Sequence, residues 1–444
     1  MSIATKLAKL KTIKQDIKSA LEEKGQTPSN VFSTYANNIR AIEIGGGSSS
    51  DDPRINRSSN YPEIPLPSQI METEDVVYFL LDATSLFCFL NVYVDTGTGF
   101  NYVVEKYNNN TLVKTEEAVL IGSSQKLTLY FGYDTDNEWD TYNYVRIKLV
   151  GNISNLNFQG VSAVNRKFEY QGIIEISGKC SSCILNFNSD SGYAKSCLKN
   201  IEYFSFKGFD IGSYYGQSST AYGFYELDTI CYGELELIEN ASNKTSSLFQ
   251  RNIRLISMPN LINFNSEYSA GMFNGCTNIN EIDFTSYYDY VNAGAFAYNC
   301  NSVRHIKITG NYLSNVYNAF NGCNLVTNIN VPKLGNNVNT IYQCFNNCYN
   351  LQETPNWDLS NVTTTTNAFN YCYSLVKFNM YGMKVSFSLS DSTLLSESEL
   401  VKIFNNLADL TNSSSQTLTL GTTLLAKLTY EEKAIATNKN WTLA

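Results

Sequence analysis

A single pattern occurs five times between Met272 and Met380: a phenylalanine, then a cysteine, then aliphatic residues at short spacing. The first copy reads Phe273-x-x-Cys276-x-x-Ile279-x-x-Ile282-x-Phe284. The steps from one phenylalanine to the next are 23, 24, 25 and 24 residues. A constant period of this length is typical of a solenoid, in which each repeat forms one coil and stacked coils share a core. The later copies begin at Phe296, Phe320, Phe345 and Phe369.

The pattern predicts two columns of buried side chains along this solenoid. The five phenylalanines should stack in one column, and five free cysteines should form a second, because an unpaired cysteine behaves as a small buried hydrophobe. The apolar-x-apolar pair that closes each copy has the period of a short strand. The fourth copy departs from the pattern, with Thr354 and Asn356 at the apolar positions. The predicted cysteine column contains Cys276, Cys300, Cys323, Cys348 and Cys372.

An asparagine follows most of the phenylalanines and indicates a turn in which its side chain bonds to nearby backbone. The residues between the inward positions of each strand should face outward and align from coil to coil. Because these rows are polar and mixed in charge, they suit a sugar or a polar protein surface better than phosphate. The asparagines are Asn274, Asn321, Asn346 and Asn370. The outward rows are Glu281, His305, Asn328, Glu353 and Lys377, and, two residues on, Asp283, Lys307, Asn330, Pro355 and Asn379.

Tyrosines in the predicted turns form a rim that we expect to bind the receptor, because rigid aromatic side chains dominate the binding energy of many interfaces. The alternative is that both the rim and the strand rows are inert solenoid surface and that binding lies elsewhere. The rim consists of Tyr287, Tyr288, Tyr290, Tyr312 and Tyr342.

The repeats resemble the BspA-like leucine-rich repeats of bacterial surface proteins. The segment Trp357-Asp358-Leu359-Ser360-Asn361-Val362-Thr363 resembles the related repeat class of bacterial surface lipoproteins. The resemblance covers roughly a third of the chain, and the fivefold spacing carries it. It implies a scaffold for binding and implies no chemistry.

The solenoid is expected to span residues 166–390 and to end in a cap at residues 391–444. Phe224 and Phe249 extend the phenylalanine ladder backward, which predicts at least seven coils. In the cap, Ser396 and Thr429 each begin a capping-box pattern that predicts a helix, the first through Leu407. Residues 417–421 and 440–443 read as short strands.

Residues 60–165 contain short runs of β-branched and aromatic residues divided by turn clusters, which predicts an all-β antiparallel sandwich. Sandwiches of this kind often bind sugars or form trimer contacts, by analogy at the level of fold. Trp139 lies among acidic residues and is read as a loop anchor rather than a sugar-stacking platform.

Residues 1–44 read as an amphipathic helical hairpin, with Gly25 between its two helices and a Gly/Ser linker at residues 45–59. A hairpin of this size needs a partner surface to be stable. The segment resembles the N-terminal attachment region of bacteriophage tail and fibre proteins, which implies docking to a virion. The predicted attachment residues are Leu7, Leu10, Ile17, Leu21, Phe32, Tyr35 and Ile39.

The sequence contains no recognisable catalytic or cofactor motif, so we expect no enzyme and no cofactor. His305 is the single histidine and is expected to face solvent, and there is no phosphate-binding glycine loop or HExxH motif. Cys180-x-x-Cys183 lacks the second pair that a zinc site needs. The net charge of −9 argues against nucleic acid as the main ligand. No apolar run has the length of a membrane span, and we read no signal peptide.

The predicted fold is therefore multidomain: an N-terminal α-hairpin, an all-β sandwich, and an α+β/β leucine-rich-repeat solenoid with a C-terminal cap. The expected function is that of a phage virion appendage, a tail or head fibre, which attaches by its N-terminus and presents the solenoid to a host. Expected partners are other virion proteins, two further copies of the chain in a homotrimer, and a host-surface glycan or protein. The alternative is a BspA-like adhesin on a bacterial surface, and a polysaccharide-degrading enzyme is less favoured.

Overall fold

The computed structural model divides the chain into two compact units, residues 1–55 and 56–444. All described residues belong to the second unit. The predicted helical hairpin and its attachment residues therefore lie outside the described residues, as do the linker, Trp139 and Phe224. The described residues are 75–83, 89–108, 111–130, 142–158, 173–186, 203–211, 231–237, 247–264, 269–285 and 290–444.

The first part of this unit consists of antiparallel strands in two layers, as the runs of β-branched residues predict. One layer has the order β1-β6-β3-β4, and in the other β2 pairs with β5 and β7. The layers share buried side chains, and the rings of Phe79 and Phe158 meet edge to face at 6.0 Å. The strands are β1 (Val76–Asp82), β2 (Phe89–Asp95), β3 (Gly99–Asn108), β4 (Thr111–Ile121), β5 (Ser124–Tyr130), β6 (Tyr144–Val150) and β7 (Asn155–Phe158).

These strands continue into the solenoid without a break in the sheet. Strand β1 pairs with β6 on one side and with β8 (Ile173–Asn186) on the other, both antiparallel. Strand β8 then begins a parallel series through β9 (Tyr203–Ile211), β10 (Cys231–Leu237) and β11 (Asn260–Ile262). The boundary predicted between residues 165 and 166 thus falls within one hydrophobic core. The physical reason is that the first coil would otherwise expose its edge, which the antiparallel strands cover.

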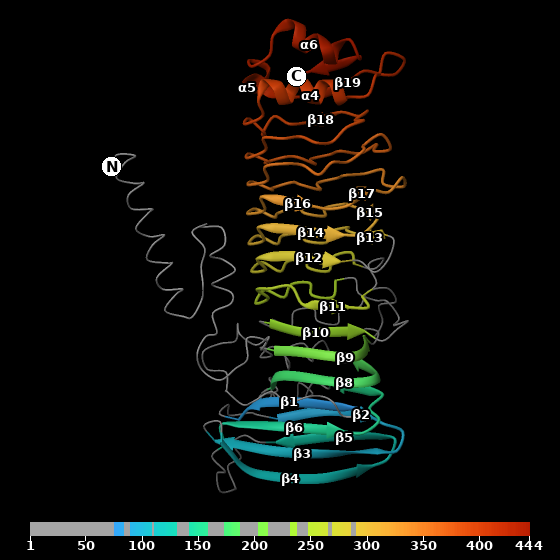
Figure 1. The fold of residues 1–444 in the computed structure, drawn as a ribbon, viewed down its shortest axis with the longest axis vertical. Helices are drawn as coiled ribbons and strands as arrows, with labels where there is room; N and C mark the ends of the chain where they lie inside the picture. The colour runs from blue at the N-terminus through green and yellow to red at the C-terminus, as the bar shows by residue number, and fades with distance from the viewer. Residues whose placement is uncertain are drawn as a thin grey trace, which may run out of the picture. The chain divides into compact units, whose positions relative to one another are not determined.

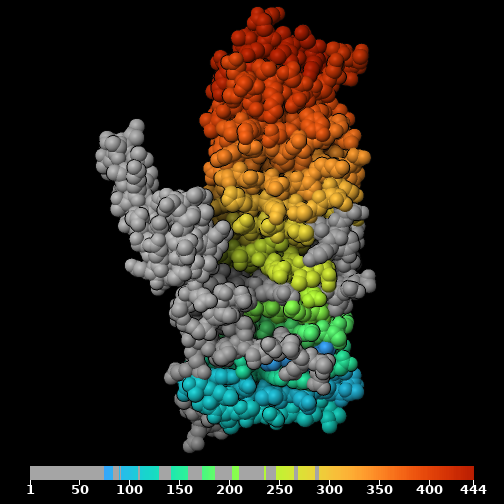
Figure 2. All heavy atoms as spheres, viewed as in Figure 1, coloured from blue at the N-terminus to red at the C-terminus, as the bar shows by residue number. Residues whose placement is uncertain are grey.

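The solenoid has about nine turns, and three successive coils contribute strands to two separate parallel sheets, while isolated bridges join the later coils. Strands β12 (Glu281–Thr285), β14 (His305–Thr309) and β16 (Asn328–Asn330) form the first sheet. Strands β13 (Tyr290–Asn292), β15 (Tyr312–Asn315) and β17 (Lys333–Leu334) form the second. The strands of each sheet lie one above another in Figure 1, and side chains fill the spaces between the coils in Figure 2. In the described coils the connections are turns, and the described helices lie in the cap.

Each of the six described coils from Ser247 to Cys372 bends at two residues in the left-handed backbone conformation, which flank the turn that contains the phenylalanine and the cysteine. This regularity explains why asparagine and glycine recur there, because both adopt positive φ at low cost. The first set is Ser247, Gly271, Ala295, Asn318, Gln343 and Asn367. The second set, each one residue before the cysteine position, is Arg251, Gly275, Asn299, Gly322, Asn347 and Tyr371.

The asparagines that follow the phenylalanines make a different set of contacts from the one predicted. The side-chain Nδ2 of Asn346 donates to Oδ1 of Asn321 at 3.2 Å, and Nδ2 of Asn321 donates to Oε1 of Gln343 at 3.4 Å. These two bonds join side chains of neighbouring coils, and Asn321 and Asn370 also donate to Oδ1 of Asn318 and Asn367 within their own coils. The prediction that these asparagines bond to nearby backbone was therefore wrong here, because side-chain oxygens of the same and the next coil lie within reach.

The phenylalanine column is present, with one exception. Stacked rings have centroids 5.4 Å apart for Phe249 and Phe273, 5.8 Å for Phe320 and Phe345, and 5.9 Å for Phe345 and Phe369. Phe296 is buried as predicted, but it meets Phe273 edge to face, with an angle of 81° between the ring planes.

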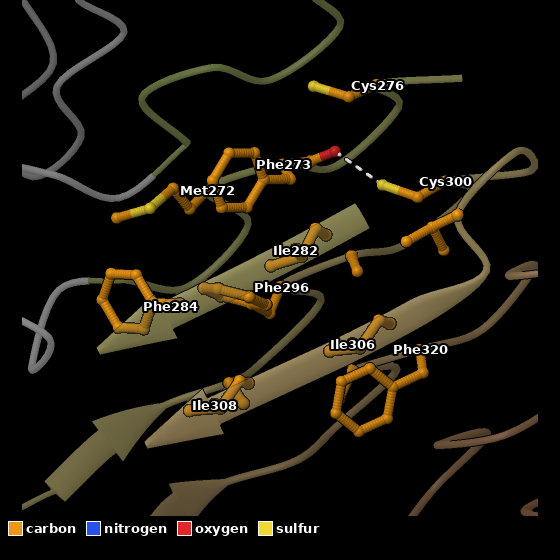
Figure 3. Close-up of a cluster of buried hydrophobic side chains, with 14 of the residues drawn as sticks. Met272, Phe273, Cys276, Ile282, Phe284, Phe296, Cys300, Ile306, Ile308 and Phe320 are labelled. Carbon is orange, nitrogen blue, oxygen red and sulfur yellow. Dashed lines mark hydrogen bonds between the residues drawn. The ribbon is translucent and has the colours of Figure 1, made fainter. Parts of the chain in front are cut away.

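A shift of one residue explains the exception. Phe296 lies four residues before its cysteine, whereas the other phenylalanines lie three before. The backbone N–H of Phe273 donates to the carbonyl of Phe296, as that of Phe249 donates to the carbonyl of Met272. Phe296 therefore occupies the position of Met272, and its ring packs on Phe284 at 5.5 Å (Figure 3). Ala297, three residues before Cys300, takes the place in the column. The placement of Phe296 in the column was wrong.

This register predicts the effect of adding a ring at Ala297. A pattern search would regard Ala297→Phe as an improvement, but Phe296 already fills the neighbouring space. We expect the variant to be about 1–3 kcal/mol less stable, because overpacking forces side chains off their preferred rotamers. Urea denaturation of the full chain checks this, with Phe296→Ala as the companion variant, which should lose about 3–5 kcal/mol. Equal or greater stability of Ala297→Phe would contradict the register.

The cysteine column is confirmed, and its thiols are free and buried. Each thiol donates a hydrogen bond to a carbonyl oxygen in the preceding coil, at a sulfur–oxygen distance of 3.0 to 3.2 Å. The bond from Cys300 to the carbonyl of Phe273 is drawn in Figure 3. Burial raises the pKa of the Cys276 thiol to about 12 and also raises the pKa values of the other column thiols. The cysteines thus connect successive coils through polar contacts inside an apolar core.

The predicted cap closes the far end of the core. Helix α4 (Glu397–Asn406) begins after Ser396, whose Oγ accepts from the N–H of Glu399 at 3.2 Å. Helix α6 (Tyr430–Thr437) begins with a complete capping box between Thr429 and Glu432, and the short α5 spans Gly421–Leu425. Strands β18 (Phe387–Ser388), β19 (Gln416–Thr419) and β20 (Trp441–Leu443) form a parallel sheet. Trp441, which is 2% exposed, packs edge to face on Phe387.

Candidate recognition face

The outward rows align across β12, β14 and β16 as predicted. Glu281 pairs with His305 and His305 with Asn328, while Asp283 pairs with Lys307 and Lys307 with Asn330. These side chains are exposed, and the residues between them are buried. The single histidine therefore faces solvent, as expected. The result is a flat polar face formed by the first parallel sheet.

The charges on this face are arranged in pairs. Nζ of Lys307 lies 2.9 Å from a carboxylate oxygen of Asp283, and Nζ of Lys377 lies 2.5 Å from one of Glu353. Both pairs are about half exposed, so solvent screens them and they add little stability. Their main effect is to leave the face with little local excess charge.

The regular alternation of the face fails in the fourth repeat, where the sequence departs from the pattern. Thr354 and Pro355 are both buried, Asn356 is exposed, and Trp357 is buried, so the inward positions shift by one residue. The prediction that Pro355 faces outward was therefore wrong. Trp357 accounts for the shift, because its large ring packs on Phe345 at 5.5 Å and its Nε1 donates to the carbonyl of Pro332 at 2.9 Å.

The shifted segment is bonded to the coil that follows it. The N–H of Thr354 donates to the carbonyl of Lys377 at 3.1 Å, and its Oγ1 accepts from the N–H of Asn379 at 2.8 Å. On the other side, the ladder to β16 is not continued, and proline at position 355 has no N–H to donate. The sheet therefore opens between β16 and this segment.

A depression of about 510 Å³ occupies the opening. Its lining is mainly polar, with Ile329 and Val331 as apolar members. In the described part of the chain, no hydrogen bond engages the side chains of Asn328, Asn330, Gln352 or Asn356. Each of these amides offers both donors and an acceptor to a ligand. The described lining residues are His305, Thr327, Asn328, Ile329, Asn330, Val331, Gln352, Glu353, Thr354, Pro355 and Asn356.

The predicted tyrosine rim is divided into two stacked pairs. Tyr290 and Tyr312 lie side by side on β13 and β15, with ring centroids 5.7 Å apart. Tyr342 stacks on Tyr317 at 4.9 Å with an angle of 8° between the rings. Tyr287 and Tyr288 lie outside the described residues. Whether these rings bind a receptor stays a prediction.

Sequence reasoning missed Tyr317, although a signal for it was available. Tyr317 and Tyr342 both lie six residues before the cysteine of their own repeat, so stacking of the coils had to bring them together. Tyr317 is 46% exposed, the more open member of the pair. Counting positions from the cysteine would have found it.

Other classes of site receive no support among the described residues. No group of three or more His, Cys, Asp and Glu side chains there is placed to hold a metal ion. Cys180 and Cys183 are buried free thiols on β8, and the hydrogen bond with Cys183, together with burial, raises the pKa of Cys180. None of the described helices has the length and apolar character needed to span a bilayer.

Comparison with known proteins identifies the repeats. The family described as BspA type Leucine rich repeat region matches residues 245–376 in six copies. The matched residues include the depression and both tyrosine pairs. No curated protein and no solved structure matches the chain. The resemblance to BspA-like repeats is thus confirmed, and the comparisons give no relative that would place the chain in a virion or on a bacterial surface.

Proposed function

We propose that this chain, which carries BspA-type leucine-rich repeats, is a non-catalytic recognition or adhesion protein that binds a polar ligand in the depression of its strand face. One observation carries the proposal. The regular sheet opens at one repeat, and amide side chains without hydrogen bonds to the described chain gather at that opening. Flat solenoid surface gives little enclosure to a ligand, whereas a concave site surrounds it.

The lining favours an uncharged polar ligand. The described lining residues include no lysine or arginine, and their one carboxylate, Glu353, is paired with Lys377. Phosphate and nucleic acid favour lysine and arginine contacts, which the described lining does not offer. Sugar hydroxyls and peptide groups instead match the paired donors and acceptors of Asn328, Asn330 and Gln352. We therefore propose a glycan or a polar protein segment as the ligand class.

We further propose a specific role, that of a bacteriophage virion appendage, a tail or head fibre. The support is in the sequence: the amphipathic pattern of residues 1–44, the Gly/Ser linker, and their resemblance to phage attachment regions. The alternative is a bacterial cell-surface adhesin with the same repeat. Neighbouring reading frames that encode capsid and tail proteins would favour the first proposal, and their absence would favour the second.

The proposed homotrimer has a candidate contact surface in β4. Among the described strands, β4 pairs only with β3, and its apolar side chains are open, with Val119 at 63% and Ile121 at 82% exposure. Unprotected edge strands are ready sites for pairing between chains. Light scattering of the purified chain measures the number of copies, and a monomer would argue against the trimer.

The binding proposal predicts the effect of filling the depression. Asn330→Trp places a large ring over its floor, and we expect binding to weaken roughly tenfold or more, as for truncation or obstruction of an interface hot spot. The labelled full-length chain is measured on a glycan array and on a panel of bacterial cells. The matched control is Asn336→Trp, an exposed asparagine beyond the depression. Equal binding by the Asn330→Trp variant and the parent would exclude the depression as the site.

A further inference from the structure

Three exposed tyrosines lie together at the turn that follows the phenylalanine column in the last two repeats. Tyr349, Tyr371 and Tyr373 are 39%, 44% and 50% exposed. The rings of Tyr349 and Tyr373 lie 5.7 Å apart and are inclined by 31°. The ring of Tyr371 meets that of Tyr373 at 6.1 Å and 61°, so the three rings form an angled aromatic surface. We call it the tyrosine platform.

The other repeats show that the fold does not need these rings. Tyr349 and Tyr373 directly follow the cysteine of their repeats, and Tyr371 directly precedes one. In the other repeats that contain the cysteine, the same two positions hold small turn residues, whereas the coil of Phe249 has Arg251 and Ile253 there. Those after the cysteine are Thr277, Asn301 and Asn324, and those before it are Gly275, Asn299, Gly322 and Asn347. The aromatic side chains are thus additions to a turn that folds without them.

Tyr371 also has a strained backbone. Its φ is 62°, in the left-handed region that the equivalent residues of other repeats enter as glycine or asparagine, apart from Arg251. A bulky residue there is a real outlier. Its N–H donates to Oδ2 of Asp391 at 2.8 Å, which holds the turn in place. Because the ring is 44% exposed, burial of the side chain does not offset the strain. Strain retained at an exposed residue is typical of a functional site.

We propose that the tyrosine platform is a second binding site, which stacks on the sugar ring of an uncharged glycan. Aromatic side chains with polar groups at their edge suit a ligand that has one apolar face and a rim of hydroxyls. Here the edge groups are the Asp391 carboxylate and the side chain of Asn347, whose Oδ1 accepts from the Tyr349 hydroxyl at 3.4 Å. The platform is a separate site from the depression, and its expected ligand is an uncharged glycan.

Electrostatics agree with a neutral ligand. Partial desolvation, the carboxylate of Asp391 and the two neighbouring phenols raise the pKa of Tyr373, so its hydroxyl remains a hydrogen-bond donor at physiological pH. Asp391 beside the rings disfavours phosphates and acidic sugars. The platform is also only three rings wide, with short polar side chains such as Asn347 and Ser374 beside them. That area suits one or two sugar units better than a stable protein interface.

The substitutions that test the platform are those that the other repeats already use. They are Tyr349→Asn, Tyr371→Asn and Tyr373→Thr. Tyr371→Asn should raise the melting temperature, because asparagine adopts positive φ more easily than tyrosine does. A loss of binding in that variant could not be attributed to misfolding. The control is Tyr430→Ser on α6, a tyrosine that is 83% exposed and lies outside the platform.

The experiment titrates the full-length protein with cellohexaose, laminarihexaose, mannohexaose and chitohexaose, followed by tyrosine fluorescence and calorimetry. We expect at least one of them to bind, and Tyr373→Thr to weaken that binding roughly tenfold or more while Tyr430→Ser leaves it unchanged. Absence of binding to all four, or binding insensitive to the three substitutions, would overturn the proposal. Self-association of the protein that Tyr373→Thr abolishes would also overturn the proposal, because the platform would then bind a second copy of the chain. Binding of choline chloride that Tyr373→Thr abolishes would overturn it too, because the platform would then bind a cation. Asn330→Trp should leave platform binding intact, which separates this site from the depression.

Discussion

Replacement of Phe345 by alanine is expected to lower the free energy of unfolding of the solenoid by about 3–5 kcal/mol. Phe345 is fully buried, and its ring lies 5.8 Å from Phe320, 5.9 Å from Phe369 and 5.5 Å from Trp357. The cavity cannot close easily, because the backbone on both sides is held by bonds between coils, such as the one from the N–H of Phe345 to the carbonyl of Ala368. The loss should therefore lie in the range of large core truncations.

The measurement is urea denaturation of the full chain, followed by tryptophan fluorescence, since Trp357 packs directly on the altered position. Tyr430→Ala is the control, because substitution of a side chain that is 83% exposed should change stability by less than about 0.5 kcal/mol. A loss below about 1 kcal/mol in the Phe345→Ala variant would show that the column is not packed as described.

The second large effect is expected from alkaline pH. Burial raises the pKa of six thiols in the solenoid above their ordinary value near 9, as for Cys276, at about 12. When folding raises the pKa of a thiol, the protein keeps its full stability at pH values below the pKa of the unfolded chain. Stability is then lost as the pH rises from that value toward the pKa of the thiol in the folded state. Between pH 8 and 10, each thiol should therefore remove on the order of 1 kcal/mol. Six such losses are comparable to the whole stability of a typical domain, so we expect unfolding near pH 10.

Denaturation curves at pH 8, 9 and 10 test this expectation. Lysines and tyrosines also titrate in this range, so the comparison is made with Cys300→Ala, which removes one buried thiol. The variant should lose on the order of 1 kcal/mol less than the parent between pH 8 and 10. An identical pH dependence in the two proteins would mean that the Cys300 thiol ionises as easily in the folded state as in the unfolded chain.

Part of this molecule is determined by local sequence alone. The spacing from Phe273 to Phe369 determines the stacking of coils, because each copy has apolar groups that only a neighbouring coil can bury. The same spacing places the cysteines in a column and Glu281, His305 and Asn328 in an outward row. The caps at Ser396 and Thr429 follow from residues three positions apart, within reach of one helical turn.

Tertiary structure decided the features that depend on neighbours distant in the sequence. The continuation of the sheet from β1 to β8 joins segments that no local pattern links, so the predicted sandwich boundary fell within one core. The four-residue spacing from Phe296 to Cys300 already separates Phe296 from the column in the sequence, whereas the packing of its ring on Phe284 is seen only in the folded coils. The large ring of Trp357 likewise needs space in the core, so it shifts the inward positions by one residue, buries Pro355 and opens the sheet.

The two candidate binding surfaces divide in the same way. The tyrosine platform could have been found by counting from the cysteines, since Tyr349 and Tyr373 occupy one position in successive coils. The backbone strain at Tyr371 could not have been found in this way, because its φ is set by the turn between coils and not by the residue itself. The sequence thus determined which residues recur in each coil. Only the packing of the coils decided where the sheet opens and which rings meet, because both depend on how side chains of different size fit between coils that stack at a constant distance.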